Sequence, residues 1–592
     1  MRFQSSEVSG RDPRSFPTGF FRFGDPPHNG ARRSVYAVST ILSRKIFCHR
    51  GERVSFRFAL AVSLAYWPLS PGALPAGALG QSKPAPAAVS PSVATSKAKK
   101  PRLSAQTKKF AERVETLLAS APVSKGEWGL LIIDAETGET LFELNADKYF
   151  LPASNMKLFT TALALAKLGP DYRFHTTLET RGTIAPEGVL TGDLFLVGRG
   201  DPNLSNRRFP YNLKEEFDGP PEKVLAELAD ALMAKGVKKI AGDVVGDDSY
   251  FPREPYPSGW EIDDIVWEYG AAISAIVVDD NTTSLTLTPG QSAGAPVEAV
   301  VAPATPDFIV QNDVVTSAAE TKSDLTLTRE PNSKIVVIRG TMPAHSAPRK
   351  LVLAIHDPAE HAAALLTQLL ADRGVKISGL SRSMHIPEPT SAMPRAVVAE
   401  HISVPLGDSV KLVNKISQNL HTEMLLRAAA RNTAVWNTPD DLAKFPADFY
   451  AAAGIAPGDV IQHDASGLSR HDLVTPRAIV ALLKYAQTQP WFPPYYASLP
   501  VAGVDGTLET VMKNTLSAGH IHAKTGSVEH VRTRSGFADT DAGRRLIFSF
   551  LSNNQGGTNH EASDALDGLC LAMMEEFDRK PPATHGPRQR AH

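Results

Sequence analysis

The chain of 592 residues has little cysteine, no strong excess of either charge and no long apolar run. Its two cysteines, Cys48 and Cys570, exclude a disulfide-stapled scaffold and a cysteine-rich metal site. With 62 Lys and Arg against 63 Asp and Glu, the chain is too near neutral for a dedicated nucleic-acid-binding protein. What remains is a globular composition, 42% hydrophobic. At ~100–200 residues per domain, the length suggests about three or four domains.

Residues 1–80 have the character of a leader with a signal peptide at about 50–80. Three arginines precede the short apolar run 58–67, and turn-forming and small residues follow it as far as position 80. That layout is typical of a secretory signal, and a buried apolar helix of the folded protein is the alternative interpretation. The fifty upstream residues suggest a mis-assigned start codon or an extended leader. We therefore expect export, a periplasmic location and a mature chain with no transmembrane anchor.

The charge balance changes once this leader is removed. Residues 1–80 hold 11 Lys and Arg and 4 Asp and Glu, so the rest of the chain holds 51 and 59, a net charge of −8. Residues 81–102 are rich in Pro, Ala and Lys and are predicted to be a disordered tether. The polar tail 581–592 shows no amphipathic anchor pattern.

Apolar periodicity and turn residues predict one sheet domain assembled from both ends of the chain. Its first part, 103–175, contains a β-hairpin over 128–145 with its turn at Gly138, followed by a helix over 154–167. Its second part, 391–580, contains a helical stretch over 410–430, three antiparallel strands and a last helix. Residues 176–390, with many short β-rich runs, are predicted to be an insertion. The three strands are expected at 521–525, 532–538 and 545–552, and the last helix at 561–577.

Two stretches of the insertion are alike. Residues 221–238 and 358–376 each combine a Pro-initiated Ala/Leu helix with a following Gly-Val-Lys. A recurring structural unit explains this likeness, and coincidence explains it equally well, because helices that end in glycine are common.

Ser154-Asn-Met-Lys157 opens the first predicted helix. Residues three apart lie ~5–6 Å from each other on one helix face, so the hydroxyl and the amine can meet. A lysine with a lowered pKa can accept the proton of a serine nucleophile. The helix N-terminus supplies N–H groups for an oxyanion. Alone the pattern is weak, because Ser154 as a helix cap and Lys157 as a solvated side chain fit it too.

Two further motifs give the first one its weight. Ser417-Gln-Asn419 follows 263 residues after Ser154 within the predicted helical stretch, and Lys524-Thr-Gly526 follows on a predicted strand. Either motif alone has little meaning. All three in this order, each in its expected structural context, form a specific combination.

The combination resembles the active-site set of penicillin-binding proteins and serine β-lactamases. The long first interval is similar to that of the low-molecular-mass class C penicillin-binding proteins, the D-alanyl-D-alanine carboxypeptidase/endopeptidases. The resemblance extends over about 105–577 and implies an α/β (α+β) DD-peptidase/β-lactamase-like catalytic domain with a β-rich insertion. It implies peptidoglycan stem peptides as substrates and β-lactam antibiotics as inhibitors. The similar segments are 196–204, 242–251, 259–264, 464–470 and 499–508.

The resemblance also implies catalytic roles. Ser154 would attack the carbonyl of a D-Ala-D-X peptide or a β-lactam, and Lys157 would take its proton. Ser417 would pass a proton toward the leaving amine, while Asn419 would hold the substrate and orient Lys157. Lys524 would supply positive charge and depress the pKa of Lys157.

Substrate binding follows in the same way. Thr525 would contact the terminal carboxylate of the substrate, and Gly526 would let the substrate backbone approach. The backbone N–H of Ser527 would complete an oxyanion hole with that of Ser154.

A side-chain subsite is implied by an inserted-domain aspartate and an arginine that this branch associates with the amine and carboxylate of diaminopimelate. The matching positions are Asp247 and Arg470, with Phe251 beside them. Asp247 as a turn cap, with Asp248 competing for the role, and Arg470 in a surface ion pair are the alternatives.

Two other functions stay open. A β-lactamase or D-amino-acid esterase would use the same scaffold, although Gln418 stands where class A β-lactamases have aspartate. A non-catalytic cell-wall binding module would need none of the intact motifs. No metal or organic cofactor is implied, since residues 198–203 lack the third glycine of a dinucleotide loop and His560 lacks a second zinc ligand. The oligomeric state and the balance of carboxypeptidase and endopeptidase activity are left open.

Overall fold

The computed structural model describes residues 104–579, apart from positions 121–122, 206, 213–214, 218, 304, 306–307, 390, 434–435, 437 and 557–558. The predicted leader, the tether and the tail 581–592 lie outside the described residues. In the part that is described, no helix is both long and apolar enough to cross a membrane.

A five-stranded antiparallel sheet in the order β2-β1-β23-β22-β21 joins the two ends of this part of the chain. The hairpin of β1 (Glu127–Asp134) and β2 (Thr140–Leu144) turns at Gly138, whose φ of 72° suits glycine. β1 then pairs with β23. The predicted hairpin, the three later strands and their common sheet are confirmed. The other strands are β21 (Ile521–Val528), β22 (Val531–Asp539) and β23 (Arg545–Asn553).

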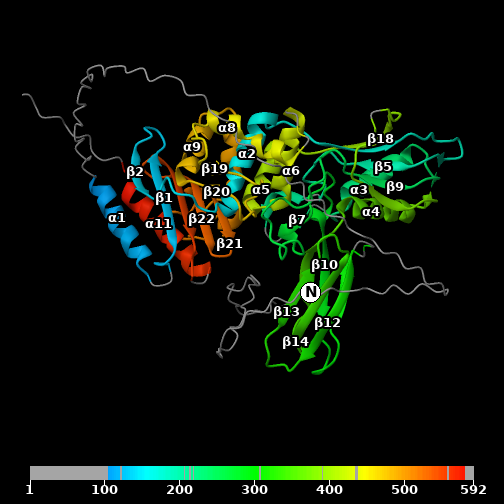
Figure 1. Cartoon of the computed structure of the whole chain (residues 1–592), viewed down its shortest axis with the longest axis horizontal. Coiled ribbons are helices and arrows are strands. Elements are labelled where there is room, and N and C mark those ends of the chain that lie inside the picture. The colour runs from blue at the N-terminus through cyan, green and yellow to red at the C-terminus, as the bar shows by residue number, and fades with distance from the viewer. Residues whose placement is uncertain are drawn as a thin grey trace, which may run out of the picture. The chain divides into compact units, whose positions relative to one another are not determined.

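Apolar side chains cover both faces of this sheet, because alternate residues of each strand point to opposite sides. Leu130 and Ile132 of β1 pack with the helices α1 (Ala105–Leu118) and α11 (Asn559–Phe577). Leu131 and Ile133 pack into the larger core on the opposite face. Figure 1 shows α1 and α11, from opposite ends of the described chain, lying side by side.

The larger core contains the helices that carry the motifs. Gly169, at φ 82°, ends α2 (Met156–Leu168). The predicted helical stretch 410–430 is two helices, α5 (Leu406–Ile416) and α6 (Asn419–Thr433), separated by Ser417 in the left-handed conformation. The expectation that the second motif lies inside a helix is therefore wrong. The remaining helices here are α7 (Pro439–Lys444), α8 (Ala447–Ala452), α9 (Pro476–Ala486) and α10 (Phe492–Ser498).

The inserted region has its own five-stranded sheet, in the order β17-β9-β5-β3-β18. Its first strand, β3 (His175–Thr180), pairs with its last, β18 (Ala396–Ile402), and the Ser403 N–H donates to the Phe174 carbonyl at 3.0 Å. Strand pairing therefore ends the insertion after Ile402 rather than at the expected 390. The sheet also contains β5 (Leu194–Val197), β9 (Val244–Asp247) and β17 (Ser381–Met384), with α3 (Lys223–Ala234) and α4 (Pro358–Asp372) against one face.

The two alike stretches occupy equivalent places. After α3 and α4 the chain forms β8 (Lys239–Ile240) and β16 (Lys376–Ile377), which pair in parallel, as do β9 and β17. An equivalent strand pair without the helix precedes them, because β4 (Val189–Leu190) pairs in parallel with β8 and β5 with β9. These parallel pairings favour a recurring unit over coincidence.

A β-sandwich is nested within the insertion. One layer has the order β11-β10-β15 and the other β12-β14-β13, with an apolar core between them. The strands are β10 (Thr282–Thr288), β11 (Glu298–Ala302), β12 (Ile309–Ser317), β13 (Asp324–Arg329), β14 (Ile335–Pro343) and β15 (Arg349–Ala354).

Candidate active site

Ser154 lies in the short 3-10 turn Ala153–Asn155 that leads into α2. Ala153 has a φ of 46°, a strained conformation for a residue with a side chain. Thr533 of β22 holds the turn in place, because its hydroxyl donates to the Pro152 carbonyl at 3.0 Å and contacts the Asn155 amide. The predicted serine thus stands on a turn anchored to the central sheet.

Lys157 is fully buried, and its amine contacts residues of the first two motifs. Its Nζ donates to Ser154 Oγ at 2.9 Å and to Asn419 Oδ1 at 2.6 Å. A third bond goes to the Ser466 carbonyl at 2.7 Å. The expected meeting of Ser154, Lys157 and Asn419 is present in the structure.

Burial lowers the pKa of Lys157 to about 7, although the carboxylates of Asp464, Glu423 and Asp472 act in the opposite direction. At that value the amine is partly unprotonated near neutral pH and can accept a proton from Ser154. Burial and the nearby Lys157 also lower the pKa of Lys524. Desolvation, rather than the expected repulsion by Lys524, is thus the first cause of the Lys157 shift.

The third motif meets the second. Lys524 Nζ donates to Ser417 Oγ at 2.9 Å and to the Thr525 carbonyl at 2.8 Å. The left-handed conformation of Ser417, φ 63° and ψ 38°, stops α5 just before the hydroxyl. Lys415, on the last turn of α5, reaches the Leu499 carbonyl at 2.6 Å and pairs with Asp505.

β21 supplies the other wall of the site. A Cβ on Gly526 would lie 3.0 Å from the Ser154 nitrogen and 2.8 Å from the Pro152 carbonyl, so only glycine lets this strand approach the nucleophile. Thr525 Oγ1 lies 2.8 Å from Thr507 Oγ1, and Ser527 is exposed. The sheet therefore presents hydroxyl groups beside Ser154.

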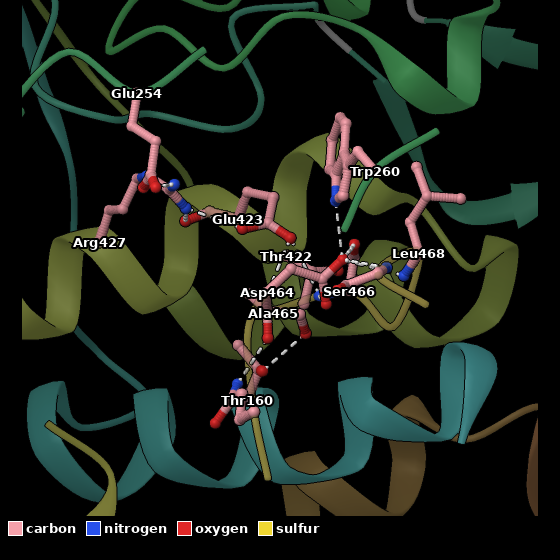
Figure 2. Close-up of polar contacts among 12 residues, drawn as sticks. Thr160, Glu254, Trp260, Thr422, Glu423, Arg427, Asp464, Ala465, Ser466 and Leu468 are labelled. Carbon is pink, nitrogen blue, oxygen red and sulfur yellow. Dashed lines mark hydrogen bonds and ion pairs between the residues drawn. The ribbon is translucent and has the colours of Figure 1, made fainter. Parts of the chain in front are cut away.

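A tight loop over 464–469 brings the Ser466 carbonyl to Lys157. Figure 2 shows Asp464, Ala465, Ser466 and Leu468 of this loop. The Asp464 carboxylate organises it. Burial alone would raise the pKa of Asp464, but its hydrogen bonds hold the pKa below the usual value. The donors are the Ser466, Gly467, Leu468 and Ser469 backbone N–H groups and Trp260 Nε1, at 2.6–3.1 Å.

Glu423 of α6 holds the same loop from a second side, as Figure 2 shows. Its Oε1 accepts from the Ala465 and Ser466 N–H groups at 2.9 and 3.0 Å, and its Oε2 pairs with Arg427 at 2.7 Å. Thr160 Oγ1 of α2 donates to the Ala465 carbonyl at 2.7 Å. Burial raises the pKa of Glu423 to about 7.

Asp247 and Phe251 have partners other than the groups just described. The Asp247 carboxylate is buried, pairs with Arg395 at 2.6 Å and accepts from Ser249. Phe251 is buried against Trp436 and Tyr250. The expected use of Asp247 to bind substrate does not fit a carboxylate that is already paired, whereas the turn contact with Ser249 fits the turn-cap alternative.

Arg470 stands near a different aspartate. It is partly exposed, bonds the Glu529 carbonyl at 3.3 Å and lies 3.3 Å from the Glu261 carboxylate. Asp264 lies close enough to Arg470 for the guanidinium to lower its pKa, although burial raises that pKa overall. Tyr269 hydrogen-bonds Asp264 with its side chain and accepts from Asn419 Nδ2 with its carbonyl at 2.9 Å. The segment with Asp264 and Tyr269 thus reaches the second motif.

Several residues of the site carried no signal strong enough to identify them from sequence. Asp464 lies in a segment that the sequence resemblance already includes, but its role depends on the loop it closes. Glu423 reads as one polar position of an amphipathic helix. Thr507 and Tyr269 come close to the motifs only through folding.

Comparison with known proteins identifies the family of the chain. The model of the D-Ala-D-Ala carboxypeptidase 3 (S13) family matches residues 110–573. The chain is 31% identical over 482 residues to a D-alanyl-D-alanine carboxypeptidase of Actinomadura sp. (strain R39), covering 80% of this chain and 85% of that protein. It is 27% identical to D-alanyl-D-alanine carboxypeptidase DacB of Haemophilus influenzae, covering 76% and 89%.

The fold has a solved counterpart. Penicillin binding protein 4 (dacB) of H. influenzae superposes with a TM-score of 0.68 at 24% identity, covering 79% of this chain and 99% of that one. The mixed α/β fold with antiparallel sheets is confirmed. The chain therefore belongs to the D-Ala-D-Ala carboxypeptidase 3 (S13) family, the low-molecular-mass class C penicillin-binding proteins, and is a serine DD-peptidase of peptidoglycan.

Proposed function

We propose that Ser154 is the nucleophile and Lys157 the general base of an acyl-enzyme mechanism on D-Ala-D-X stem peptides. Ser154 Oγ attacks the peptide carbonyl and its proton moves to Lys157 Nζ. The tetrahedral oxyanion accepts from the N–H groups of Ser154 and Ser527. The carbon–nitrogen bond then breaks, and the leaving amine takes the proton that Lys157 gained, by way of Ser417, so that Lys157 is unprotonated again.

Deacylation repeats these steps with water as the nucleophile. Lys157 accepts a proton from water, the hydroxide attacks the ester, and Ser154 Oγ leaves and regains a proton. Lys524 supplies positive charge beside Ser417, and Thr525 contacts the terminal carboxylate. Thr507, hydrogen-bonded to Thr525, orients that hydroxyl.

One observation carries this proposal. The buried Lys157 amine, with a pKa of about 7, stands 2.9 Å from the Ser154 hydroxyl. A positioned base acts best when its pKa is close to the working pH. A structural relative from H. influenzae has been solved in complex with a β-lactam, which supports a β-lactam as the probe.

The test is intact-mass spectrometry of residues 81–592 after incubation with benzylpenicillin, beside Ser154→Ala. A persistent adduct on the wild type alone supports the proposal. Rapid release of hydrolysed drug would favour a β-lactamase instead. Folded protein that neither forms an adduct nor hydrolyses the drug would favour a binding module.

We propose that the side-chain subsite pairs Arg470 with Asp264 rather than with Asp247. A side chain bearing both an amine and a carboxylate, as diaminopimelate does, needs an anion and a cation that lie near each other. Asp264 lies beside Arg470 and within the segment that contacts Asn419. The carboxylate of Asp247 is paired with Arg395.

Asp264→Asn and Asp247→Asn distinguish these assignments. Asp264→Asn should reduce kcat/KM for a diaminopimelate-containing peptide more than for the lysine-containing one, whereas Asp247→Asn should leave the ratio unchanged. The reverse pattern would restore Asp247.

Export of the chain to the periplasm is a further proposal, supported by the sequence of residues 50–80. N-terminal sequencing of the mature protein from its native cell tests it. A start near residue 80 supports cleavage, and an intact residue 1 contradicts it.

A further inference from the structure

Three successive residues of the insertion adopt a conformation that side chains disfavour. Asp279, Asp280 and Asn281 form a 3-10 turn with φ values of 51°, 50° and 57°. Left-handed residues other than glycine usually occur singly. Such strain persists only where the surroundings fix it, often at a functional site.

The side chain of Asp280 shows what fixes this turn. Its carboxylate is buried and accepts from Ser205 Oγ at 2.5 Å and from Arg207 Nε at 2.7 Å. His421 Nε2 lies 2.9 Å from Oδ1. Burial alone would raise the pKa of Asp280, but Arg207 and His421 hold the pKa far below its usual range. The group is thus a permanent buried anion.

The remaining partner of Asp280 is the middle residue of the second motif. Gln418 Nε2 donates to Asp280 Oδ2 at 3.0 Å, while Gln418 Oε1 accepts from the Leu420 N–H at 2.8 Å. His421 lies on the first turn of α6. Asp280 therefore holds both the centre of Ser417-Gln-Asn419 and the helix that follows it.

A second contact from the insertion reaches the same motif. The Tyr269 carbonyl accepts from Asn419 Nδ2, whose other amide atom, Oδ1, accepts from Lys157. Ser417 itself is left-handed, so nothing in its own backbone preference keeps its hydroxyl beside Lys524. Besides its contacts with Lys157 and Lys524, the motif is thus held by two contacts from the inserted region, those of Asp280 and of the Tyr269 carbonyl.

We propose that Asp280 is a positioning residue of the DD-peptidase, which fixes Ser417 and Asn419 for acylation through Gln418 and His421. The proposal rests on the roles assigned to Ser417 and Asn419 above. It gives Gln418 a role and makes the insertion part of the catalytic apparatus. Misplacing a catalytic group by about 1 Å is enough to slow a reaction about 10²-fold.

A double-mutant cycle tests this coupling. Asp280→Asn, Gln418→Met and the double variant are compared by the acylation rate constant at saturating benzylpenicillin and by the dissociation constant of the non-covalent complex. We expect Asp280→Asn to slow acylation about 10–100-fold with a near-constant dissociation constant, because geometry and not affinity is lost. The double variant should be no slower than the slower single variant, since both changes break one coupling.

Asp279→Asn is the matched control. It changes the neighbouring left-handed residue, which asparagine tolerates, and should acylate at the wild-type rate. Equal slowing by Asp279→Asn, additive effects in the cycle, or a lower melting temperature with an unchanged acylation rate would each overturn the proposal.

If Asp280→Asn does not fold, Gln418→Met alone decides. This variant removes the contact between Gln418 and Asp280 by changing the residue of the catalytic motif. An unchanged acylation rate in Gln418→Met would overturn the proposal. Acylation of the wild type and its loss in Ser154→Ala test the proposed function independently of either outcome.

Discussion

The two five-stranded sheets of this protein differ in what covers their faces. Strands β1 and β23 of the catalytic sheet send apolar side chains into a core on each side. The insertion sheet buries one face against α3 and α4, and on the other it carries a small apolar cluster around Phe195. There Arg395 lies 3.7 Å from the Phe195 ring centroid and pairs with Asp247 and Glu388.

The comparison distinguishes buried charges that take part in the reaction from buried charges that only stabilise the fold. On the insertion sheet, the Asp247 carboxylate is paired directly with the Arg395 guanidinium. Beside the catalytic sheet, Lys157 has no carboxylate within its own hydrogen bonds, and its pKa is shifted to about 7. A charge that is buried without a direct counter-charge is the better indicator of chemistry.

Removing one buried cation from each region gives the largest contrast. Lys157→Met should slow acylation by about 10²–10⁴-fold, the range expected for a lost general base. Arg395→Met should leave the acylation rate of folded protein unchanged, although an unpaired Asp247 lowers stability. Stopped-flow measurement of β-lactam acylation checks both, and a large loss in Arg395→Met would refute the distinction.

Replacing a buried phenylalanine of each sheet by alanine tests how completely apolar side chains cover the two sheets. Phe548→Ala in the catalytic sheet should lower the free energy of unfolding by about 3–5 kcal/mol, because its ring is fully buried in the core that includes residues of α1 and α11. Phe195→Ala should cost less, since Phe195 lies in a small cluster with Val197, Val245 and Met384 rather than in a large core. Denaturant titration measures both, and equal losses would contradict this view of the insertion sheet.

The two regions should also respond to pH in opposite ways. Acylation should fall about tenfold per pH unit below about 7, because protonated Lys157 cannot act as a base. In the insertion, Asp248 and Asp357 raise the pKa of His385 to about 9, although burial alone would lower it. That stabilisation is complete below pH 6.5 and is lost as the pH rises through about 9.

The acylation rate and the free energy of unfolding, each measured from pH 5 to 10, test these two pH dependences. In His385→Asn the loss of stability between pH 7 and 9.5 should shrink while the acylation profile stays unchanged. If His385→Asn also shifted the pH below which acylation falls, the two titrations would be linked.

The smallest expected contrast concerns two carboxylates. Glu423→Gln keeps an acceptor for the Ala465 and Ser466 N–H groups but loses the pair with Arg427, so acylation should slow about 10-fold or less. Glu388→Gln, its counterpart in the insertion, should change the rate by less than twofold. The same kinetic assay separates them, and an unaffected Glu423→Gln would remove Glu423 from the support of Lys157.

Local patterns were sufficient for much of the catalytic region. Ser154 and Lys157 three residues apart place a hydroxyl beside an amine, and the alternation around Lys524 indicates a strand that presents it. Flanking turns and apolar periodicity located the hairpin, the last three strands and the last helix. All of these depend on residues close together in the chain.

The features that local patterns could not give depend on contacts between residues far apart in the chain. Apolar residues continue across 406–433, so the local sequence does not predict that the helix is interrupted at Ser417. Asp247 ends strand β9 and Asp264 lies in a turn, yet in the sequence both are acidic residues of similar segments, and only the pairing of Arg395 with the first and the approach of Arg470 to the second distinguishes them. The role of Asp280 likewise requires a contact across 138 residues.

The pairing of β3 with β18 has a consequence for how this protein arose. The inserted chain leaves the catalytic region at Phe174 and returns at Ser403, two residues joined by a backbone hydrogen bond. The more than two hundred residues of the insertion therefore begin and end at neighbouring points of the catalytic domain, as a single short loop would. A gene encoding a smaller ancestor could acquire the whole segment in one recombination event, without re-threading any strand of the original sheet.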